Sequence, residues 1–479
     1  MVSEHVRVRF APSPTGMMHL GNIRAALIDY LFAQQKKGVF VLRIEDTDPQ
    51  RNVDPAGKQI IADLQWLGLT YDEGPIVGGT YGPYLQSERS EIYQKHLDAL
   101  QQKGFVYECF CTAEELDRKK QRQIALKMPP RYDRQCLKLT RQEVEHKRAE
   151  RVPFIWRFKL PDVEIAVTDF ARGTMRYNLK NFSDFPLTRQ DGSFTFVFAN
   201  FVDDLVMHIT HVFRGEEHLS STALQAIMYQ AFGHPIPTFW HFPIICNETG
   251  KKLSKRDFGF SLDDLKKAGF FAEAIVNYLA ILGGSFEHEI MRLSELAQII
   301  DFEKTASAGF IKYDVEKLRW VNHQWMQLFS IQEVAQRCQP LLVVRYPAAS
   351  AMSLIELASV ILPIRKELVT LTDVVTKLQF YFERPHLDIQ LLHAQNVSAY
   401  RDLLRSCISE YQPTQSADEF VAVLKLSCKS AGLPLKDFFS LIRIALTGSP
   451  QGVGIKELWE ILPVQEAITR LNNLLHTIS

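Results

Sequence analysis

The sequence predicts an α/β fold, with a sheet of parallel strands covered by helices and an all-helical region after it. Three patterns carry this prediction: an alternating apolar segment that switches to helical spacing near the N-terminus, a continuous apolar run that ends in carboxylates, and purely helical periodicity after about residue 261. The 479 residues allow about three domains at a soft prior of about 150 residues each.

The first element is a strand, a tight turn and a helix. Val6, Val8 and Phe10 alternate with polar residues, and the segment 12–16, with two prolines and Gly16, ends the strand. A helical face then follows, built from Leu20, Ile23, Leu27, Tyr30 and Leu31, with Gly38 in a C′ position. His19 and Gly21 fall in the first helical turn, where free N–H groups favour a phosphate and glycine permits close approach. A buried strand and helix of any α/β domain would look similar.

The second strand is the apolar run 39–44, which is typical of a buried parallel strand. It ends at Glu45, Asp46 and Asp48, and carboxyl ends of strands are where open α/β sheets bind ligands. The alternative is a polar exit that caps the next helix. Helices are predicted around 56–67 and 90–103.

Composition excludes several classes of protein. Lys plus Arg and Asp plus Glu both number 55, so the net charge of zero gives no general sign of a nucleic-acid binder. The sequence has no apolar stretch long enough for a membrane span and no signal core, and its seven scattered cysteines do not suggest a disulfide scaffold. We expect a cytoplasmic protein. No P-loop and no Gly-x-Gly-x-x-Gly motif after a strand is present.

From residue 107 the character of the chain changes. Thr112 and Glu115 form a capping-box pattern that opens a polar helix to about Lys127. Residues 113–160 carry 14 Lys and Arg against 7 Asp and Glu. This local excess suits contact with phosphates, and a solvated charged face is the alternative.

The α/β pattern resumes near Thr188. Phe194, Phe196 and Phe198 alternate ahead of Asn200, and the apolar segment 209–213 leads to Arg214. Ser220 or Ser221 is expected to cap a helix over 222–232. An arginine suits a carboxylate ligand because its planar fork matches both oxygens, although a structural ion pair would use it too.

A basic loop follows over 250–257, in which Leu253 is the one large apolar side chain. Lysine and arginine runs are commonly solvated surface, but mobile cations also suit the phosphates of a nucleotide. Beyond it only helices are predicted, separated at 346–347, 384–385, 412–413 and 448–450.

Two of these strings resemble the signatures of one family. Residues 11–22, ending in His19-Leu20-Gly21-Asn22, resemble the "HIGH" motif of class I aminoacyl-tRNA synthetases, and residues 252–256 resemble their "KMSKS" motif. The strings 43–48 and 214–218 resemble the glutamyl and glutaminyl branch. The segments 313–322 and 432–448 are similar to bacterial glutamyl-tRNA synthetases, and the all-helical C-terminal region favours glutamate over glutamine.

The resemblance implies a Rossmann-like catalytic domain split by a connective insertion, followed by helical stem-contact and anticodon-binding regions. It implies a first catalytic half at 1–106, an insertion that contacts the tRNA acceptor end at 107–186, a second catalytic half at 187–250, a KMSKS loop and stem-contact domain at 251–330 and an anticodon-binding domain at 331–479.

It also implies site residues. His19, Gly21, Lys252 and Lys255 would be catalytic, and ATP would bind at Thr15, Gly16, His19, Gly21, Asn22, Lys252, Ser254 and Lys255. Glutamate would bind at Arg9, Ala11, Ser13, Glu45, Phe196, Asn200 and Arg214, and the tRNA end at Asp204 and Glu217. The family usually has tyrosine where this chain has Phe196.

The implied reaction is ATP-dependent attachment of L-glutamate to the 3′ end of tRNA through a glutamyl-adenylate. ATP, with Mg²⁺, is a substrate, no metal ligand is assigned, and a monomer is expected. Charging of glutamine tRNA with glutamate is the alternative. A small nucleotidyltransferase or a tRNA-nucleoside-modifying enzyme would lack the long helical region, and an inactive scaffold would be expected to lose His19, Gly21 or Lys255.

The insertion carries Cys109, Cys111 and Cys136, where some relatives bind zinc with a fourth ligand two positions after the last cysteine. Lys138 stands there, and structural zinc nearly always has four Cys or His ligands. Tyr132 or His146 would need unusual geometry to complete the set. Zinc is therefore predicted to be absent, with buried free thiols in its place.

Overall fold

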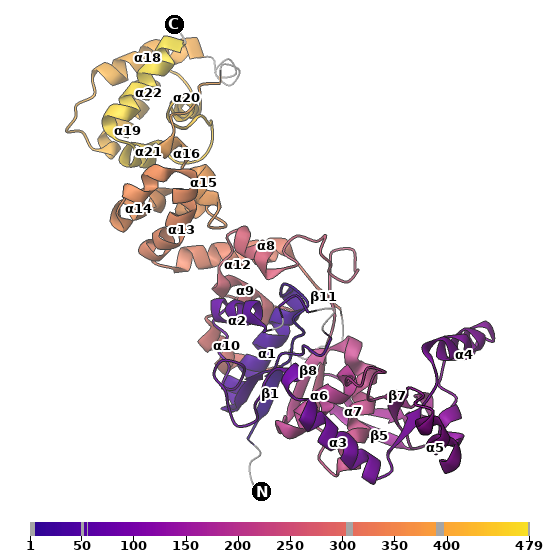
Figure 1. The fold of residues 1–479 in the computed structure, drawn as a ribbon. Coiled ribbons are helices and arrows are strands. Elements are labelled where there is room, and N and C mark those ends of the chain that lie inside the picture. Colours follow the sequence, from indigo (N-terminus) through magenta and orange to yellow (C-terminus); the bar gives the residue numbers. More distant parts are fainter. Residues whose placement is uncertain (1–4, 49–51, 55, 303–309, 389–396, 478–479) are drawn as a thin grey trace. The chain divides into compact units, whose positions relative to one another are not determined.

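The fold is described here from a computed structural model, which describes residues 5–48, 52–54, 56–302, 310–388 and 397–477 (Figure 1). The chain divides into two compact units, one formed by residues 1–265 and 275–315 and the other by residues 266–274 and 316–479. The first unit holds the described strands and the second is helical. The predicted class, a parallel-stranded α/β region followed by helices, is therefore confirmed. The five-part division made from the sequence stays a prediction.

The N-terminal elements have the predicted order: β1 (Arg7–Phe10), α1 (Leu20–Lys36), β2 (Val39–Leu42), α2 (Lys58–Trp66) and α3 (Ser90–Gln102). Strands β1 and β2 pair in parallel, with Val8 opposite Phe40. Helix α1 ends differently from the expectation. Lys37, with φ of 50°, takes the left-handed position, whereas Gly38 is required because a Cβ there would overlap the backbone of Val6.

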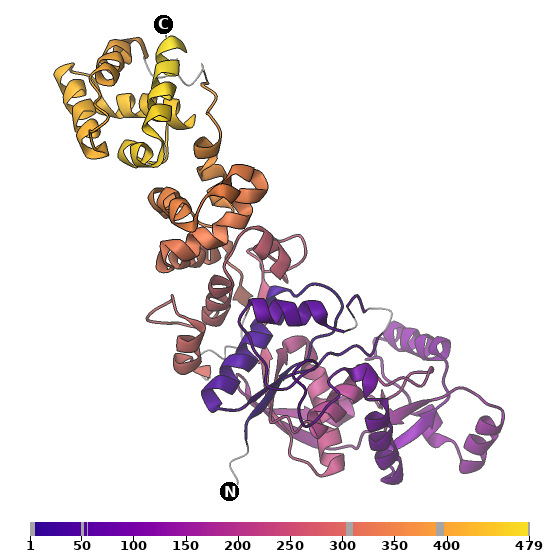
Figure 2. The ribbon, with the colours of Figure 1, turned by 60° about the vertical axis from the view of Figure 1, so that its left-hand side comes forward.

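The segment predicted as an insertion contains β3 (Val106–Cys109), α4 (Ala113–Ala125), α5 (Arg141–Ala149), β4 (Ile155–Phe158), β5 (Glu164–Asp169), β6 (Gly173–Asn178) and β7 (Phe185–Pro186). The capping box of Thr112 and Glu115 is present at α4. In both ribbon views α4 and α5 lie apart from α1 and β1 (Figures 1 and 2). The β5–β6 hairpin, in contrast, joins a larger sheet, because β5 pairs in parallel with β9 (Thr238–Phe242) at Asp169 and Phe239.

The second α/β segment contains α6 (Phe196–Val206), β8 (His211–Gly215), α7 (Leu219–Phe232), β9 (Thr238–Phe242) and β10 (Ile245–Cys246). Four strands form a sheet in the order β6-β5-β9-β8. The backbone N–H of Thr210 donates to the carbonyl of Arg7 at 3.0 Å, so β8 lies beside β1. The carboxyl ends of β1, β8 and β9 consequently meet at one edge.

This segment departs from its alternating pattern in one place and from an expected helix cap in another. The alternation of Phe194, Phe196 and Phe198 does not continue as a strand, because α6 starts at Phe196. Ser220 and Ser221 do not cap α7 either. The 3₁₀ turn Glu216–His218 runs directly into α7, so both serines lie inside its first turn.

Beyond β10, the α-helices and the one strand of the described residues are as follows. They are α8 (Leu262–Lys267), α9 (Ala272–Ile281), α10 (Leu293–Ile299), β11 (Ile311–Lys312), α12 (Val315–Leu328), α13 (Ile331–Arg345), α14 (Leu354–Ile361), α15 (Asp373–Lys377), α16 (Gln379–Phe382), α18 (Val397–Ser409), α19 (Ala417–Ser430), α20 (Leu435–Thr447), α21 (Ile455–Ile461) and α22 (Val464–Thr477). The predicted breaks between helices fall where expected. Across the described residues, every helix is too short or too polar to cross a membrane.

Candidate active site

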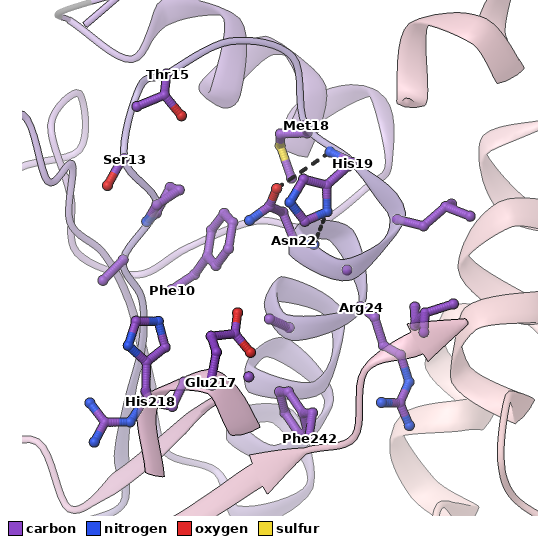
Figure 3. A pocket seen from close by; sticks show the side chains of 18 of the residues that line it. Phe10, Ser13, Thr15, Met18, His19, Asn22, Arg24, Glu217, His218 and Phe242 are labelled. Atoms are coloured by element: carbon purple, nitrogen blue, oxygen red, sulfur yellow. Dashed lines mark hydrogen bonds between the residues drawn. The ribbon is translucent and has the colours of Figure 1, made fainter. Parts of the chain in front are cut away.

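The candidate active site is a cavity of about 580 Å³ next to the N-terminus of α1 and the ends of β1, β8 and β9 (Figure 3). Most of the site residues predicted from the sequence line it: Arg9, Ala11, Ser13, Thr15, Gly16, His19, Gly21, Asn22, Glu45, Phe196, Asn200, Arg214, Glu217 and Lys252. Asp204, Ser254 and Lys255 do not. The sequence thus located the cavity through segments that lie more than 200 positions apart.

His19 is the N-cap of α1 rather than a residue of its first turn. Its Nδ1 accepts the backbone N–H of Asn22 at 3.3 Å, and the Asn22 amide oxygen accepts the backbone N–H of His19 (Figure 3). The neutral ring therefore carries its proton on Nε2. Burial and the nearby Lys252 lower the pKa of His19, against an opposing effect of Glu217. His19 is a neutral hydrogen-bond donor at pH 7.

The surroundings of His19 fix its ring. Phe260 stacks on it with ring centroids 5.3 Å apart. A Cβ at Gly21 would lie 3.1 Å from two atoms of the ring, so glycine keeps this contact open. The segment that follows the basic loop is attached to the same place, since the backbone N–H of Leu20 donates to the carbonyl of Phe260 at 3.1 Å.

Glu45 lies just after the carboxyl end of β2 and is 5% exposed. Its Oε1 accepts from Asn200 Nδ2 at 2.6 Å and from Arg43 Nη2 at 3.1 Å. Gln225 donates to the Asn200 amide oxygen at 2.8 Å, which fixes the orientation of that amide. Burial raises the pKa of Glu45, although Arg43 and Asn200 favour its charged form. A carboxylate held in this way suits an ammonium group.

Asp204 is not available to the tRNA end. Its carboxylate is 3% exposed and forms ion pairs with Arg9 Nε at 3.0 Å and Arg43 Nη1 at 2.7 Å. Burial would raise its pKa, but the two guanidinium groups outweigh burial and the pKa is lowered. The prediction for Asp204 is therefore corrected: this side chain holds Arg9 and Arg43 in place. Glu217, the other residue predicted there, is exposed and lines the cavity (Figure 3).

Arg214 lies on β8 and is 8% exposed. Its Nη2 donates to Thr222 Oγ1 at 2.6 Å. Within the described structure, its buried Nε and Nη1 have no hydrogen-bond partner. Burial lowers the pKa of Arg214, and the nearby charge of Arg9 lowers it further. The charged guanidinium is therefore unfavourable in the folded chain, and a bound anion would stabilise it. A carboxylate would pair with Nη1 or Nε together with the second N–H of Nη2.

Part of the basic loop lines the cavity, and the rest lies outside the lining. Leu253 is buried, and its backbone N–H donates to the carbonyl of Ile245 at 3.0 Å, which holds Lys252 at the cavity wall. Asp257 Oδ2 accepts from the backbone N–H and the hydroxyl of Ser254 at 2.8 and 2.9 Å. This turn keeps Ser254 and Lys255 outside the cavity lining.

Several cavity residues were not predicted. Phe242 ends β9, Ile244 and Ile245 follow it where β10 begins, and Arg24 comes from the second turn of α1. His218 faces the cavity beside Phe196, with ring centroids 5.5 Å apart (Figure 3). Burial and Arg214 lower the pKa of His218 to about 4, so this ring is neutral. The sequence did offer a signal for His218, because this residue belongs to the 214–218 string that resembles the glutamyl and glutaminyl branch.

A cysteine cluster lies in the insertion, away from the cavity lining. The ligand atoms of Cys109, Cys111 and Cys136 lie within 4.8 Å of one another. The Tyr132 hydroxyl lies 3.3 Å from Cys109 Sγ and 3.6 Å from Cys111 Sγ. Hydrogen bonds from Cys136 and Tyr132 lower the pKa of Cys109 well below its ordinary value. Lys138 and His146 are not part of this cluster, and His146 contacts Glu150.

The fold and the cavity define a class I aminoacyl-tRNA synthetase. The family model described as "tRNA synthetases class I (E and Q), catalytic domain" matches residues 5–320, and the model of an anticodon binding domain matches residues 333–475. These two matches account for both the α/β region and the helical region.

Full-length relatives narrow the class. The chain is 36% identical to the glutamate–tRNA ligase of Finegoldia magna over 98% of this chain and 99% of that one. It is 36% identical to the glutamate–tRNA ligase of Bacillus subtilis over 99% of this chain and 100% of that one. A crystal structure of a glutamate–tRNA ligase from Elizabethkingia meningosepticum in complex with its amino acid superposes with a TM-score of 0.91 at 32% identity, covering 99% of this chain and 100% of that one. The chain belongs to the family of glutamate–tRNA ligases.

Proposed function

We propose that the cavity binds L-glutamate and ATP side by side and forms glutamyl-adenylate before transfer to tRNA. The observation that carries this proposal is Arg214, a buried arginine whose Nε and Nη1 have no partner in the described structure. It matches the side-chain carboxylate of glutamate. Glu45 and Asn200 line the same cavity, are hydrogen-bonded to each other and suit the amino group.

In the first step, an oxygen of the glutamate α-carboxylate attacks the α-phosphorus of ATP, and the bond to the leaving pyrophosphate breaks. His19 Nε2–H and the ammonium group of Lys252 are the donors placed for the developing negative charge. ATP enters as its Mg²⁺ complex. Transfer then moves the glutamyl group to the 2′-hydroxyl of the terminal adenosine, with release of AMP, so no enzyme side chain becomes covalently attached.

Positioning accounts for most of this catalysis. Gly21 leaves room for the His19 ring, and Asn22 keeps its proton on Nε2. Lys255 and Ser254 lie outside the cavity lining, and we propose that the loop brings Lys255 to the β- and γ-phosphates when ATP binds. Glutamate activation is expected to depend on tRNA.

The choice of tRNA remains a proposal of its own. We infer that the chain charges glutamate tRNA, with glutamine tRNA as the alternative acceptor. Charging of purified glutamate and glutamine tRNAs with labelled glutamate tests this. Product on the glutamate tRNA alone supports strict selection, product on both supports relaxed selection, and no product on either contradicts the proposed function.

The cysteine cluster supports a zinc site with a ligand set other than the one sought in the sequence. In a tetrahedral zinc site, metal–ligand distances of about 2.0–2.3 Å place neighbouring donor atoms about 3.5–3.8 Å apart. The Tyr132 oxygen lies 3.3 and 3.6 Å from two sulfurs, and the Cys111 and Cys136 sulfurs are 3.5 Å apart. Tyr132 would then take the ligand position that Lys138 cannot fill. Zinc here would fix the loop that joins β3 to α4.

A monomer remains our proposal for the oligomeric state. The cytoplasm, where tRNA and ATP are present, is the proposed site of action. Gel filtration with light scattering tests the first point.

A further inference from the structure

Arg214 is connected to a row of three buried side chains behind it. Strands β8 and β9 pair in parallel with Arg214 opposite His241, so the two side chains lie on the same face of the sheet. Thr222 reaches both from the first turn of α7, and Asp169 lies at the end of β5. His241 and Thr222 are fully buried, and Asp169 is 2% exposed.

The distances form a continuous chain of hydrogen bonds. Asp169 Oδ2 lies 2.7 Å from His241 Nδ1 and also accepts the backbone N–H of His241 at 3.1 Å. His241 Nε2 lies 2.7 Å from Thr222 Oγ1, which in turn lies 2.6 Å from Arg214 Nη2. These contacts are short enough for strong hydrogen bonds.

The direction of each bond follows from the carboxylate. Hydrogen bonding to His241 lowers the pKa of Asp169 despite burial, so Asp169 is an acceptor, and His241 Nδ1 must carry a proton. Burial lowers the pKa of His241, so its ring is neutral and Nε2 accepts. The Thr222 hydroxyl then donates to His241 and presents a lone pair to Arg214. The carbonyl of His218 is a longer alternative acceptor, at 3.3 Å.

The far end of this chain is itself held rigidly. Asp169 Oδ1 accepts the backbone N–H groups of Ala171 and Arg172, both at 2.9 Å. Arg172 donates to the carbonyl of His241 at 2.7 Å and to Glu216 at 2.8 Å. The turn of the β5–β6 hairpin thereby fixes both the end of β9 and the residues that follow Arg214.

We propose that Asp169, His241 and Thr222 are positioning residues that hold the Arg214 guanidinium in the orientation in which it meets the side-chain carboxylate of glutamate. This inference rests on the proposed role of Arg214. The chain of bonds uses one N–H of Nη2, which leaves the second N–H of Nη2 to form a fork for a ligand with either Nη1 or Nε, both without a partner in the described structure. The β5–β6 hairpin, which the sequence assigns to the tRNA-contacting insertion, is in this way part of amino-acid recognition.

The test compares Thr222→Val, which removes the hydroxyl at nearly constant volume, with Thr222→Ser, which retains it. ATP–pyrophosphate exchange with tRNA present gives KM for glutamate and for ATP separately. We expect Thr222→Val to raise KM for glutamate by about tenfold or more, the scale of one lost hydrogen bond to a charged group. KM for ATP should change by less than about twofold, and Thr222→Ser should restore most of the loss.

Two further variants keep the outcome decisive. Asp169→Asn, which preserves shape, should give the same selective rise and covers the case in which Thr222→Val does not fold. Thr188→Val is the matched control, because Thr188 is a buried threonine outside the cavity whose hydroxyl accepts the backbone N–H of Trp156 at 2.9 Å. It should leave both KM values unchanged.

The outcomes separate this inference from the proposed function. An unchanged KM for glutamate in Thr222→Val and Asp169→Asn, with a large rise in Arg214→Ala, overturns the positioning role only. An equal rise in both KM values, or a loss that Thr222→Ser does not restore, assigns these residues to stability alone and also overturns it. No effect of Arg214→Ala overturns the proposed function.

Discussion

Replacement of Arg214 by alanine tests the amino-acid site most directly. The side chain is 8% exposed, and two of its nitrogens await a partner, so a bound carboxylate would be almost fully desolvated. Removing one member of such a pair leaves the other charge buried and uncompensated, which costs about 2–5 kcal/mol. At ~1.4 kcal/mol per factor of ten, kcat/KM for glutamate should fall by about 30- to 5,000-fold.

The same structure predicts a small effect on stability. Burial lowers the pKa of Arg214, which means that its charged form is less favourable in the folded protein than in the unfolded chain. Loss of this charge therefore relieves an unfavourable term, while loss of the contact with Phe239, whose ring centroid lies 5.1 Å from the guanidinium carbon, acts the other way. Thermal melting of Arg214→Ala should stay close to that of the unsubstituted chain.

The assay is ATP–pyrophosphate exchange with tRNA present, run with glutamate and with glutamine. Arg214→Ala should lose far more activity with glutamate than with glutamine, because the neutral amide of glutamine cannot form an ion pair with Arg214. Arg214→Lys, which keeps the charge without the planar fork, should fall between the two. Near-normal kcat/KM for glutamate in Arg214→Ala, in a protein with normal melting, would refute the assignment.

The remaining predictions concern the loop, the cysteine cluster and His19. Lys255→Ala should slow activation by about 10²-fold, as for one lost preorganised donor, with stability changed by less than about 0.5 kcal/mol; near-normal exchange would show that the loop is only solvated surface. Metal analysis of protein purified without chelators should find about one zinc per chain, as one closed structural site requires, and Tyr132→Phe should weaken its retention; a metal-free protein contradicts the Tyr132 ligand set. The His19 ring should titrate below 6.5 by NMR, because burial and Lys252 lower its pKa; a midpoint at or above 6.5 would contradict its neutral state.

The candidate site could be located from the sequence because the spacing of apolar residues changes where its strands and helices begin and end. Alternation at Val6–Phe10 followed by helical spacing from Leu20 fixes a strand and a helix whose ends must meet at the turn between them. Parallel pairing then brings the carboxylates after β2 to the same edge. These inferences depend on local pattern alone, and the structure bears them out.

Pairing between distant charges could not be predicted in the same way. Asp204 and Asn200 lie on one helix, yet Asp204 is taken by Arg9 and Arg43, whereas Asn200 faces the cavity. Periodicity places both on a buried helix and does not say which cation each one meets. The contacts of Thr222 and His241 with Arg214 could not be predicted for the same reason, since they depend on the register of β8 with β9.

Tyr132 illustrates a third limit. In the sequence, Lys138 stands where the fourth zinc ligand is expected, and Tyr132 would need unusual geometry to take its place. The chain instead turns so that a tyrosine four residues before Cys136 places its hydroxyl on the sulfurs and accepts the backbone N–H of Cys136 at 3.1 Å. Ligands predicted from sequence spacing depend on distance along the chain, whereas the groups that can share a metal depend on distance in space.

The charges around Arg214 predict a preference for glutamate over glutamine. Arg9 and Arg43 form ion pairs with Asp204, and Arg43 also pairs with Glu45. No carboxylate contacts Arg214 in the described structure, and Asp169 is connected to it only through His241 and Thr222. The side-chain carboxylate of glutamate would supply the missing direct partner, whereas the neutral amide of glutamine would leave Arg214 without one. An uncompensated charge costs several kcal/mol in a water-poor site, so we expect this site to disfavour glutamine even though the two amino acids have nearly the same shape.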